Sequence, residues 1–160
     1  MSVLKEAEKY YPNILFIRAD SKKLPFKDKE FQLVSMIDLI EHVENPELTI
    51  KEANRIAEYA LIKVPMEDNM FINLYKFFVK TDWKKMEGHI NMFNYTSINK
   101  LMEENGFKLI KYEIPKSVMV KQKNWKLWIM NIIQCVSNMF SDKIKTYMAP
   151  VEFIGFYKAE

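Results

Sequence analysis

Glycine is scarce in this chain of 160 residues, and its scarcity excludes one kind of ligand site. The three glycines are Gly88, Gly106 and Gly155, so none lies in the first half. A glycine-rich turn lets the backbone approach a phosphate or dinucleotide closely, because it has no side chain to block the approach. The first half therefore holds no glycine-rich nucleotide loop.

Cysteine is also scarce, and the chain has neither a long apolar run nor a large excess of charge. Cys135 is the single cysteine, which excludes a disulfide framework or a cysteine-based metal cluster within one chain and favours a reducing, cytoplasmic setting. The first residues lack the apolar core of a signal peptide, and no run of about 18 apolar residues predicts a spanning helix. The net charge of +3, with scattered lysines, gives no reason to expect nucleic acid as a partner.

What is present predicts a single α/β domain. Hydrophobic residues make up 49% of the chain and charged residues 28%, which is typical of a globular fold. Helical and strand periodicities alternate along the chain. The predicted helices span 2–10, 46–57, 67–80, 96–105 and 124–140, and the predicted strands span 14–17, 31–37, 60–64, 107–114 and 151–157.

The order of these elements indicates a mostly parallel sheet. The strand at 14–17 is a continuous apolar run, which is typical of a strand covered on both faces. Asn45 and Thr96 are the expected N-caps of two helices, and Gly106 is expected to end the second of them. The strand–helix–strand unit over 31–64 is a parallel βαβ crossover, which ends where Pro65 stops the strand.

Asp20 follows the first predicted strand and precedes Leu24-Pro25-Phe26. A carboxylate at the carboxyl end of a parallel strand points into the crevice where α/β folds bind ligands, and it could accept a hydrogen bond from an adenine amino group. An aspartate in this position is more often a turn former or a helix cap. Both interpretations stay open.

Two histidines follow later strands. His42 could be a general base, because the unperturbed pKa of histidine is about 6.5, or it could hold its loop by a hydrogen bond. Its neighbour Glu41 is expected to be solvated or to cap a helix. His89, in Gly88-His89-Ile90-Asn91-Met92-Phe93, has a substrate-facing and a structural interpretation of equal weight, and no metal is implied.

Taken in order, these motifs resemble the class I S-adenosylmethionine-dependent methyltransferases of small molecules, and most closely the ubiquinone-type O-methyltransferases. The resemblance rests on four segments, which are Asp20…Leu24-Pro25-Phe26…Phe31…Val34, Leu39-Ile40-Glu41-His42-Val43, Gly88-His89…Phe93 and Leu101…Asn105-Gly106-Phe107. It implies a Rossmann-like sheet of strand order 3-2-1-4-5-7-6 with strand 7 antiparallel.

The resemblance also implies roles for particular residues. Asp20 matches the acid that contacts the adenine of S-adenosylmethionine, and Ser21 matches the neighbour that contacts the base through its backbone. Three residues at the end of the family's strand 4 match those that line the methionine part of the cofactor. They are Met36, Ile37 and Asp38.

His42 falls, by the same resemblance, in the loop beside the transferred methyl group and is the candidate catalytic base. His89 is the candidate substrate-binding residue. The whole chain, 1–160, is expected to be one partial methyltransferase-like domain with a helical insertion at about 121–147.

The chain departs from the family at its beginning. The family starts with a strand, a glycine-rich turn and a helix, and its second strand ends in an acid that binds the ribose; none of these is in this sequence. The two missing strands would lie between 14–17 and 31–37. The gap must close by direct pairing, by a second chain, or not at all.

The apolar helix at 124–140 has three interpretations. It packs on the sheet or on a homodimer partner, it forms a lid over a lipophilic acceptor, or it lies in a membrane interface, the least favoured of the three.

Three functions stay open on the sequence alone. The chain is an enzyme that methylates a small, lipophilic acceptor once a complementing chain supplies the glycine loop, a non-catalytic binding or regulatory relative, or a fragment without independent function.

Overall fold

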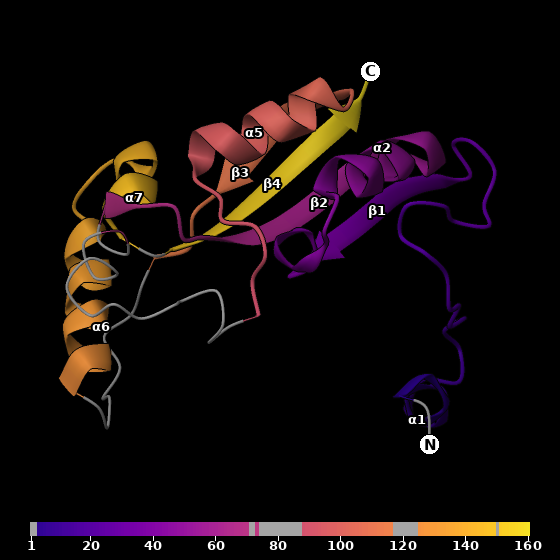
Figure 1. The fold of residues 1–160 in the computed structure, drawn as a ribbon, viewed down its shortest axis with the longest axis horizontal. Helices are drawn as coiled ribbons and strands as arrows, with labels where there is room; N and C mark the ends of the chain where they lie inside the picture. The colour runs from indigo at the N-terminus through magenta and orange to yellow at the C-terminus, as the bar shows by residue number, and fades with distance from the viewer. Residues whose placement is uncertain (1–2, 71–72, 74–87, 117–124, 150) are drawn as a thin grey trace.

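The computed structural model describes residues 3–70, 73, 88–116, 125–149 and 151–160, and these build one mixed sheet (Figure 1). The strands lie in the order β1-β2-β4-β3. Neighbours β1 and β2 run parallel, whereas β4 runs antiparallel to both β2 and β3. The strand bounds are β1 Phe31–Ile37, β2 Ala57–Met66, β3 Phe107–Glu113 and β4 Val151–Ala159. The predicted Rossmann-like sheet with a late antiparallel strand is confirmed.

Helix α2 (Pro46–Ile56) joins the parallel strands β1 and β2. Pro46 stands in the first turn as predicted, while Asn45 occupies the N-cap position without a capping hydrogen bond from its side chain. The predicted stop at Pro65 is wrong, because β2 continues to Met66. Since β1 ends opposite Lys63, Pro65 has a single strand neighbour, and an edge position of this kind tolerates proline.

Helix α5 (Tyr95–Glu104) begins one residue earlier than predicted. Its N-cap is Asn94, whose side chain accepts from the Ser97 amide at 2.9 Å, while Ser97 Oγ accepts from the Asn94 amide at 2.9 Å. This reciprocal capping box makes the prediction of Thr96 as the cap wrong. Gly106, with φ of +80°, follows the helix and leads into β3, as expected.

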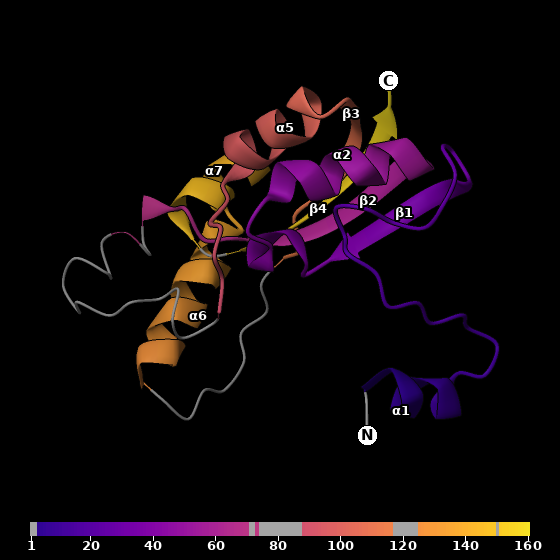
Figure 2. The same ribbon diagram turned by 45° about the vertical axis from the view of Figure 1, so that its right-hand side comes forward.

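Both α2 and α5 lie on the same face of the sheet, which we call the covered face (Figure 2). The buried core forms between these helices and the inward side chains of the strands. It includes Ile50, Ala53, Ile62, Val64, Ile98, Met102, Phe153 and Tyr157. The alternation of buried and exposed residues along β2 and β4 follows from the period of two along a strand.

Two helices, α6 (Trp125–Ser137) and α7 (Asp142–Met148), lie between β3 and β4 in sequence, where the insertion is predicted. The predicted single helix at 124–140 is thus shorter, and α7 was missed. On α6 the polar Asn131 is buried, whereas the apolar Trp128 and Val136 are each 49% exposed. The roles as packing helix, lid or membrane helix stay predictions.

The N-terminal segment shows the largest departure from expectation. Helix α1 (Val3–Tyr10) forms as predicted, but residues 14–17 form no strand. Leu15 is 82% exposed, and Ile14 and Ile17 are also exposed. A single apolar run cannot form a strand without a neighbour to accept its hydrogen bonds, so the gap beside β1 does not close. Figures 1 and 2 both show α1 standing away from the sheet.

The predicted helix at 67–80 lies mostly outside the described residues. Among the helices that the structure describes, none combines the length and apolar character needed to cross a bilayer.

Candidate functional site

The carboxyl ends of β1 and β2 meet at one edge of the sheet, because parallel strands end on the same side. A short 3-10 helix, η1 (Ile40–His42), follows β1. Met66, the last residue of β2, forms a bridge with Phe93. This bridge brings the loop that carries His89 to the same edge as η1.

Backbone hydrogen bonds join η1 to that loop. The Glu41 carbonyl accepts from the amides of Ile90 at 2.8 Å and Asn91 at 2.9 Å. Asn91 Nδ2 donates back to the Ile40 carbonyl at 3.0 Å and the Val43 carbonyl at 2.7 Å. These four bonds fix two segments that are distant in sequence, so the side chains on them are held in a defined arrangement.

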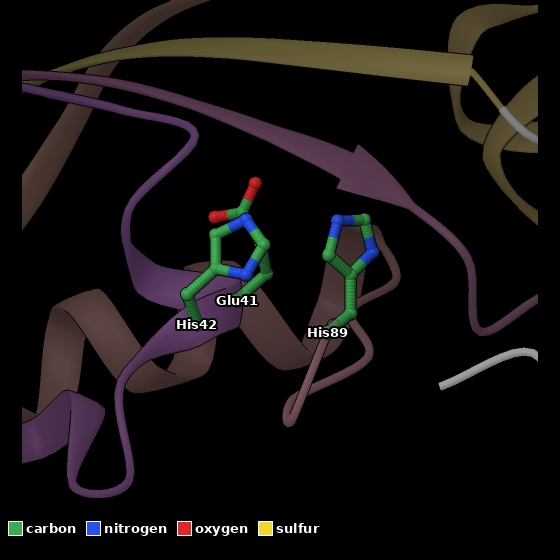
Figure 3. A group of neighbouring side chains, drawn as sticks. All are labelled: Glu41, His42 and His89. Atoms are coloured by element: carbon green, nitrogen blue, oxygen red, sulfur yellow. The ribbon is translucent and has the colours of Figure 1, made fainter. Parts of the chain in front are cut away.

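The two predicted histidines meet in this arrangement. The ring centroids of His42 and His89 lie 4.8 Å apart. Glu41 lies beside them, and one donor atom from each of the three side chains is within 4.8 Å of the other two (Figure 3). We call Glu41, His42 and His89 the Glu–His cluster.

Each imidazole uses its Nδ1 atom for a structural contact. His42 Nδ1 lies 3.2 Å from the Gly88 carbonyl oxygen, which matches the interpretation that His42 holds its loop. His89 Nδ1 lies 2.7 Å from Oε2 of Glu67. The side chain of Glu67 is buried. A catalytic role for His42 and a substrate-binding role for His89 remain predictions.

Glu41 differs from the sequence prediction. It is 1% exposed, and its Oε2 atom has no hydrogen-bond partner. Burial raises the pKa of this carboxyl above its ordinary value, because the charged form loses its hydration. The expectation that Glu41 is solvated or capping is therefore wrong; its position in a short turn between two core-facing segments buries it.

The residues predicted to line the methionine part of the cofactor separate in the structure. Met36 is 2% exposed and belongs to the core, whereas Ile37 is 54% exposed. Asp38 turns the chain with φ of +49°, and its carboxylate binds Lys63 Nζ at 3.0 Å. The hydrogen bond from Lys63 to Asp38 raises the pKa of that ammonium group, and Glu152, 3.4 Å away, contributes to the rise.

The residues predicted to contact adenine lie in a turn. With no strand before it, Asp20 accepts from the Lys22 amide at 3.0 Å and remains exposed. Ser21 Oγ lies 3.0 Å from Thr49 Oγ1 on α2. Neither of the two bonds to the Glu–His cluster, so the structure shows Asp20 as a turn former, and its role toward adenine stays a prediction.

A separate hollow of about 480 Å³ lies between α2 and the turn that follows α5, lined in part by Lys51, Arg55 and Gly106. This is the amino-terminal end of the parallel strands. Ligands of α/β folds bind at the carboxyl ends, so this hollow is not the candidate site.

S-adenosylmethionine fits the described residues only in part. Ile37 and Asp38 offer a surface at the end of β1, but Met36 is taken up by the core and the Asp38 carboxylate by Lys63. The sequence has no glycine turn for the methionine end of the cofactor. The described residues therefore match only part of the predicted cofactor-binding surface, and the contacts of Ile37 and Asp38 with the cofactor stay predictions.

Comparison with known proteins identifies the family of the chain. The methyltransferase domain family matches residues 6–112, which is more than half of the chain. This chain belongs to the methyltransferase domain family.

A curated relative matches part of the chain. An uncharacterized protein of Methanocaldococcus jannaschii is 31% identical over 101 residues, which are 61% of this chain and 48% of that protein. The match thus spans about half the length of that curated relative.

Two solved structures share the fold. A proposed methyltransferase from Bacillus halodurans C-125 has a TM-score of 0.64 at 16% identity, with 98% of this chain and 78% of that chain covered. A protein of Thermotoga maritima, described as an S-adenosylmethionine-dependent methyltransferase with histamine N-methylation suggested, has a TM-score of 0.60 at 16% identity, with 99% and 70% covered.

Proposed function

We propose that this chain supplies the acceptor side of an S-adenosylmethionine-dependent methyltransferase, which transfers a methyl group to a small, lipophilic acceptor. The observation that carries the proposal is the family match over 6–112, together with strand order β1-β2-β4-β3, equivalent to 4-5-7-6 in the family order. Fold alone would not support a reaction, because one fold hosts many activities.

The proposed reaction needs little covalent chemistry from the protein. The cofactor supplies a methyl group on a sulfonium, and the protein contributes by holding the acceptor nucleophile in line with it. Where that nucleophile is an O–H or N–H group, His42 takes its proton. Because His42 Nδ1 faces a carbonyl, its Nε2 atom has the free lone pair for this step.

The free edge of β1 supports a second part of the proposal. Phe31, Leu33 and Ile37 are exposed on β1, and no strand pairs with its outer edge among the described residues. A glycine-rich strand–turn–helix segment from outside these 160 residues would pair there and complete the cofactor site. The lipophilic character of the acceptor is inferred from the exposed apolar side chains of α6.

Calorimetric titration of S-adenosylhomocysteine tests the proposal. We expect no binding to the 160-residue chain, and micromolar binding after a glycine-rich strand–turn–helix segment from a complete methyltransferase of this fold is fused upstream of Val3. The same fusion with valine in place of its glycines is the control. Failure of a well-folded fusion to bind would refute the proposal and favour a non-catalytic binding partner.

A pair of substitutions in that fusion tests the role of Asp20. Asp20→Asn should weaken cofactor binding, whereas Glu58→Gln, an exposed acid on β2, should not. Equal affinity of both variants would leave Asp20 with its turn-forming role alone.

A further inference from the structure

The Glu–His cluster has a feature that the proton-transfer role of His42 does not use. Three side chains of metal-ligating type converge, and their donor atoms lie within 4.8 Å of one another. The cluster includes both histidines of the chain. In Figure 3 the Glu41 carboxylate and the two rings gather beneath the end of a strand, and they come from two separate segments of the ribbon.

The hydrogen bonds of the two rings select the same tautomer. A carbonyl oxygen only accepts, so the contact with Gly88 requires the proton on His42 Nδ1. The contact with the Glu67 carboxylate likewise favours a proton on His89 Nδ1. Both neutral rings therefore present an Nε2 lone pair.

Histidines that bind metals are oriented in this way in proteins. The ring nitrogen that does not bind the metal donates to a carboxylate or a backbone carbonyl, which fixes the tautomer and increases the basicity of the ligand. Here His89 has the carboxylate of Glu67 and His42 has the carbonyl of Gly88.

Glu41 indicates a bound cation independently of the two histidine rings. Its side chain is 1% exposed, and its Oε2 atom is buried without a hydrogen-bond partner. A buried carboxylate oxygen without a partner is costly, and buried charges are normally paired or coordinate a metal. A cation between Glu41 and the two imidazoles would provide the missing partner.

We propose that Glu41, His42 and His89 bind one divalent metal ion of the zinc class through Oε2 and the two Nε2 atoms. Two imidazoles and one carboxylate form a set of ligands that zinc uses in catalytic sites, where a fourth position stays open. Donors about 2.1 Å from a tetrahedral ion lie about 3.4 Å apart, so the cluster needs a modest contraction. His42 is exposed, so its side chain has room to move toward the ion.

The open position gives the metal a role that rests on the proposed function. An acceptor O–H or N–H group bound there would lose its proton more readily, because the ion stabilises the conjugate base. In the metal-bound site the ion would thus replace His42 as the group that activates the acceptor.

Zinc titration of the metal-stripped 160-residue chain, in competition with a chromophoric chelator, tests the site. We expect one Zn²⁺ per chain, and we expect Co²⁺ in its place to give the visible bands of a tetrahedral complex. His42→Asn and His89→Asn should each weaken zinc binding by at least about 100-fold. Cys135→Ser, which removes the single thiol, should leave the affinity unchanged.

Two glutamate variants test Glu41 as a metal ligand and Glu67 as the residue that orients His89. Glu41→Gln should weaken zinc binding strongly, and Glu67→Gln should weaken it about 10-fold to 100-fold through the orientation of His89. Circular dichroism establishes that each variant is folded. Should Glu41→Gln fail to fold, His42→Asn still decides, because His42 is exposed and lies outside the buried core.

Zinc affinity that is unchanged in His42→Asn and His89→Asn would overturn the proposal, as would an absence of zinc binding by the folded wild-type chain. Neither measurement involves cofactor or acceptor. Zinc binding without S-adenosylhomocysteine binding by the fusion would therefore refute the methyltransferase proposal alone, and the reverse result would refute the metal site alone.

Discussion

The covered face of the sheet and the free edge of β1 differ in what happens to apolar sequence. On the covered face Ile62 and Phe153 are fully buried beneath α2 and α5. On β1 itself Leu33 is 48% exposed, and in the preceding segment Leu15 is 82% exposed, although both lie in runs of strand-forming residues. An apolar run becomes a buried strand only where a neighbour pairs with its backbone and another layer covers its side chains.

The largest test of this contrast compares one residue from each region. Phe153→Ala should lower the free energy of unfolding by about 3–5 kcal/mol, because it leaves a cavity in the core. Leu33→Ala should lower it by less than about 1 kcal/mol, because that side chain is already half in water. Urea unfolding of both variants, followed by circular dichroism, measures the difference. Equal losses would mean that the outer side of β1 is covered in solution.

The two glycines with positive φ provide a second test. Gly106 has φ of +80°, and an added Cβ would lie 2.9 Å from Asn54 Nδ2, which donates to the Gly106 carbonyl at 2.6 Å. Gly106→Ala should therefore cost about 2 kcal/mol or more, from backbone strain and a disturbed hydrogen bond between α2 and the α5–β3 turn.

Gly88→Ala is the matched control for that substitution. Gly88 has φ of +71°, but an added Cβ meets nothing within 4 Å. Its cost should be limited to backbone strain of about 1 kcal/mol. Thermal unfolding of the two variants gives the comparison, and a larger loss for Gly88→Ala would contradict the role assigned to Asn54.

The smallest expected effect on stability concerns Glu52, through which α2 on the covered face contacts the N-terminal segment. Glu52 on α2 accepts from the Leu24 amide at 2.7 Å and from Arg55 at 2.8 Å. The hydrogen bond with Arg55 lowers the pKa of Glu52 below its ordinary value. Its contribution to stability is thus present above that ordinary pKa and is lost as the pH falls through the lower value in the folded state.

Glu52→Gln should cost about 1 kcal/mol at neutral pH, and the cost should fall in acid. Urea unfolding at several pH values measures it, with Glu47→Gln, an exposed acid on the same helix, as the control. A cost that does not depend on pH would show that the ionised carboxylate is not the stabilising form.

Most elements followed from local sequence. The helix that starts at Pro46, the strand 31–37 and the turn at Gly106 were predicted from proline, strand periodicity and glycine, whose effects depend on the residue and its near neighbours. The N-cap of α5 was assigned to Thr96 rather than Asn94, since both are capping residues and only geometry distinguishes them.

The candidate site was predictable one residue at a time. His42 and His89 were each recognised as functional candidates, but their proximity depends on the Met66–Phe93 bridge and on the bonds between Glu41 and the amides of Ile90 and Asn91. The prediction for Glu41 is wrong, because a carboxylate is normally solvated and this one is buried. The feature of the sequence that indicates its burial is its place between the apolar residues Leu39-Ile40 and Val43.

By itself the sequence determined the order and type of most elements, because periodicity, caps and turns act over a few residues. Its motifs indicated the methyltransferase family, and the family match over 6–112 confirms it. Tertiary structure alone decided that 14–17 stays unpaired, that Met36 belongs to the core, and that Glu41 is buried beside His42 and His89. Strand pairing and burial depend on groups that are distant in sequence, and their positions are fixed only when the chain has folded.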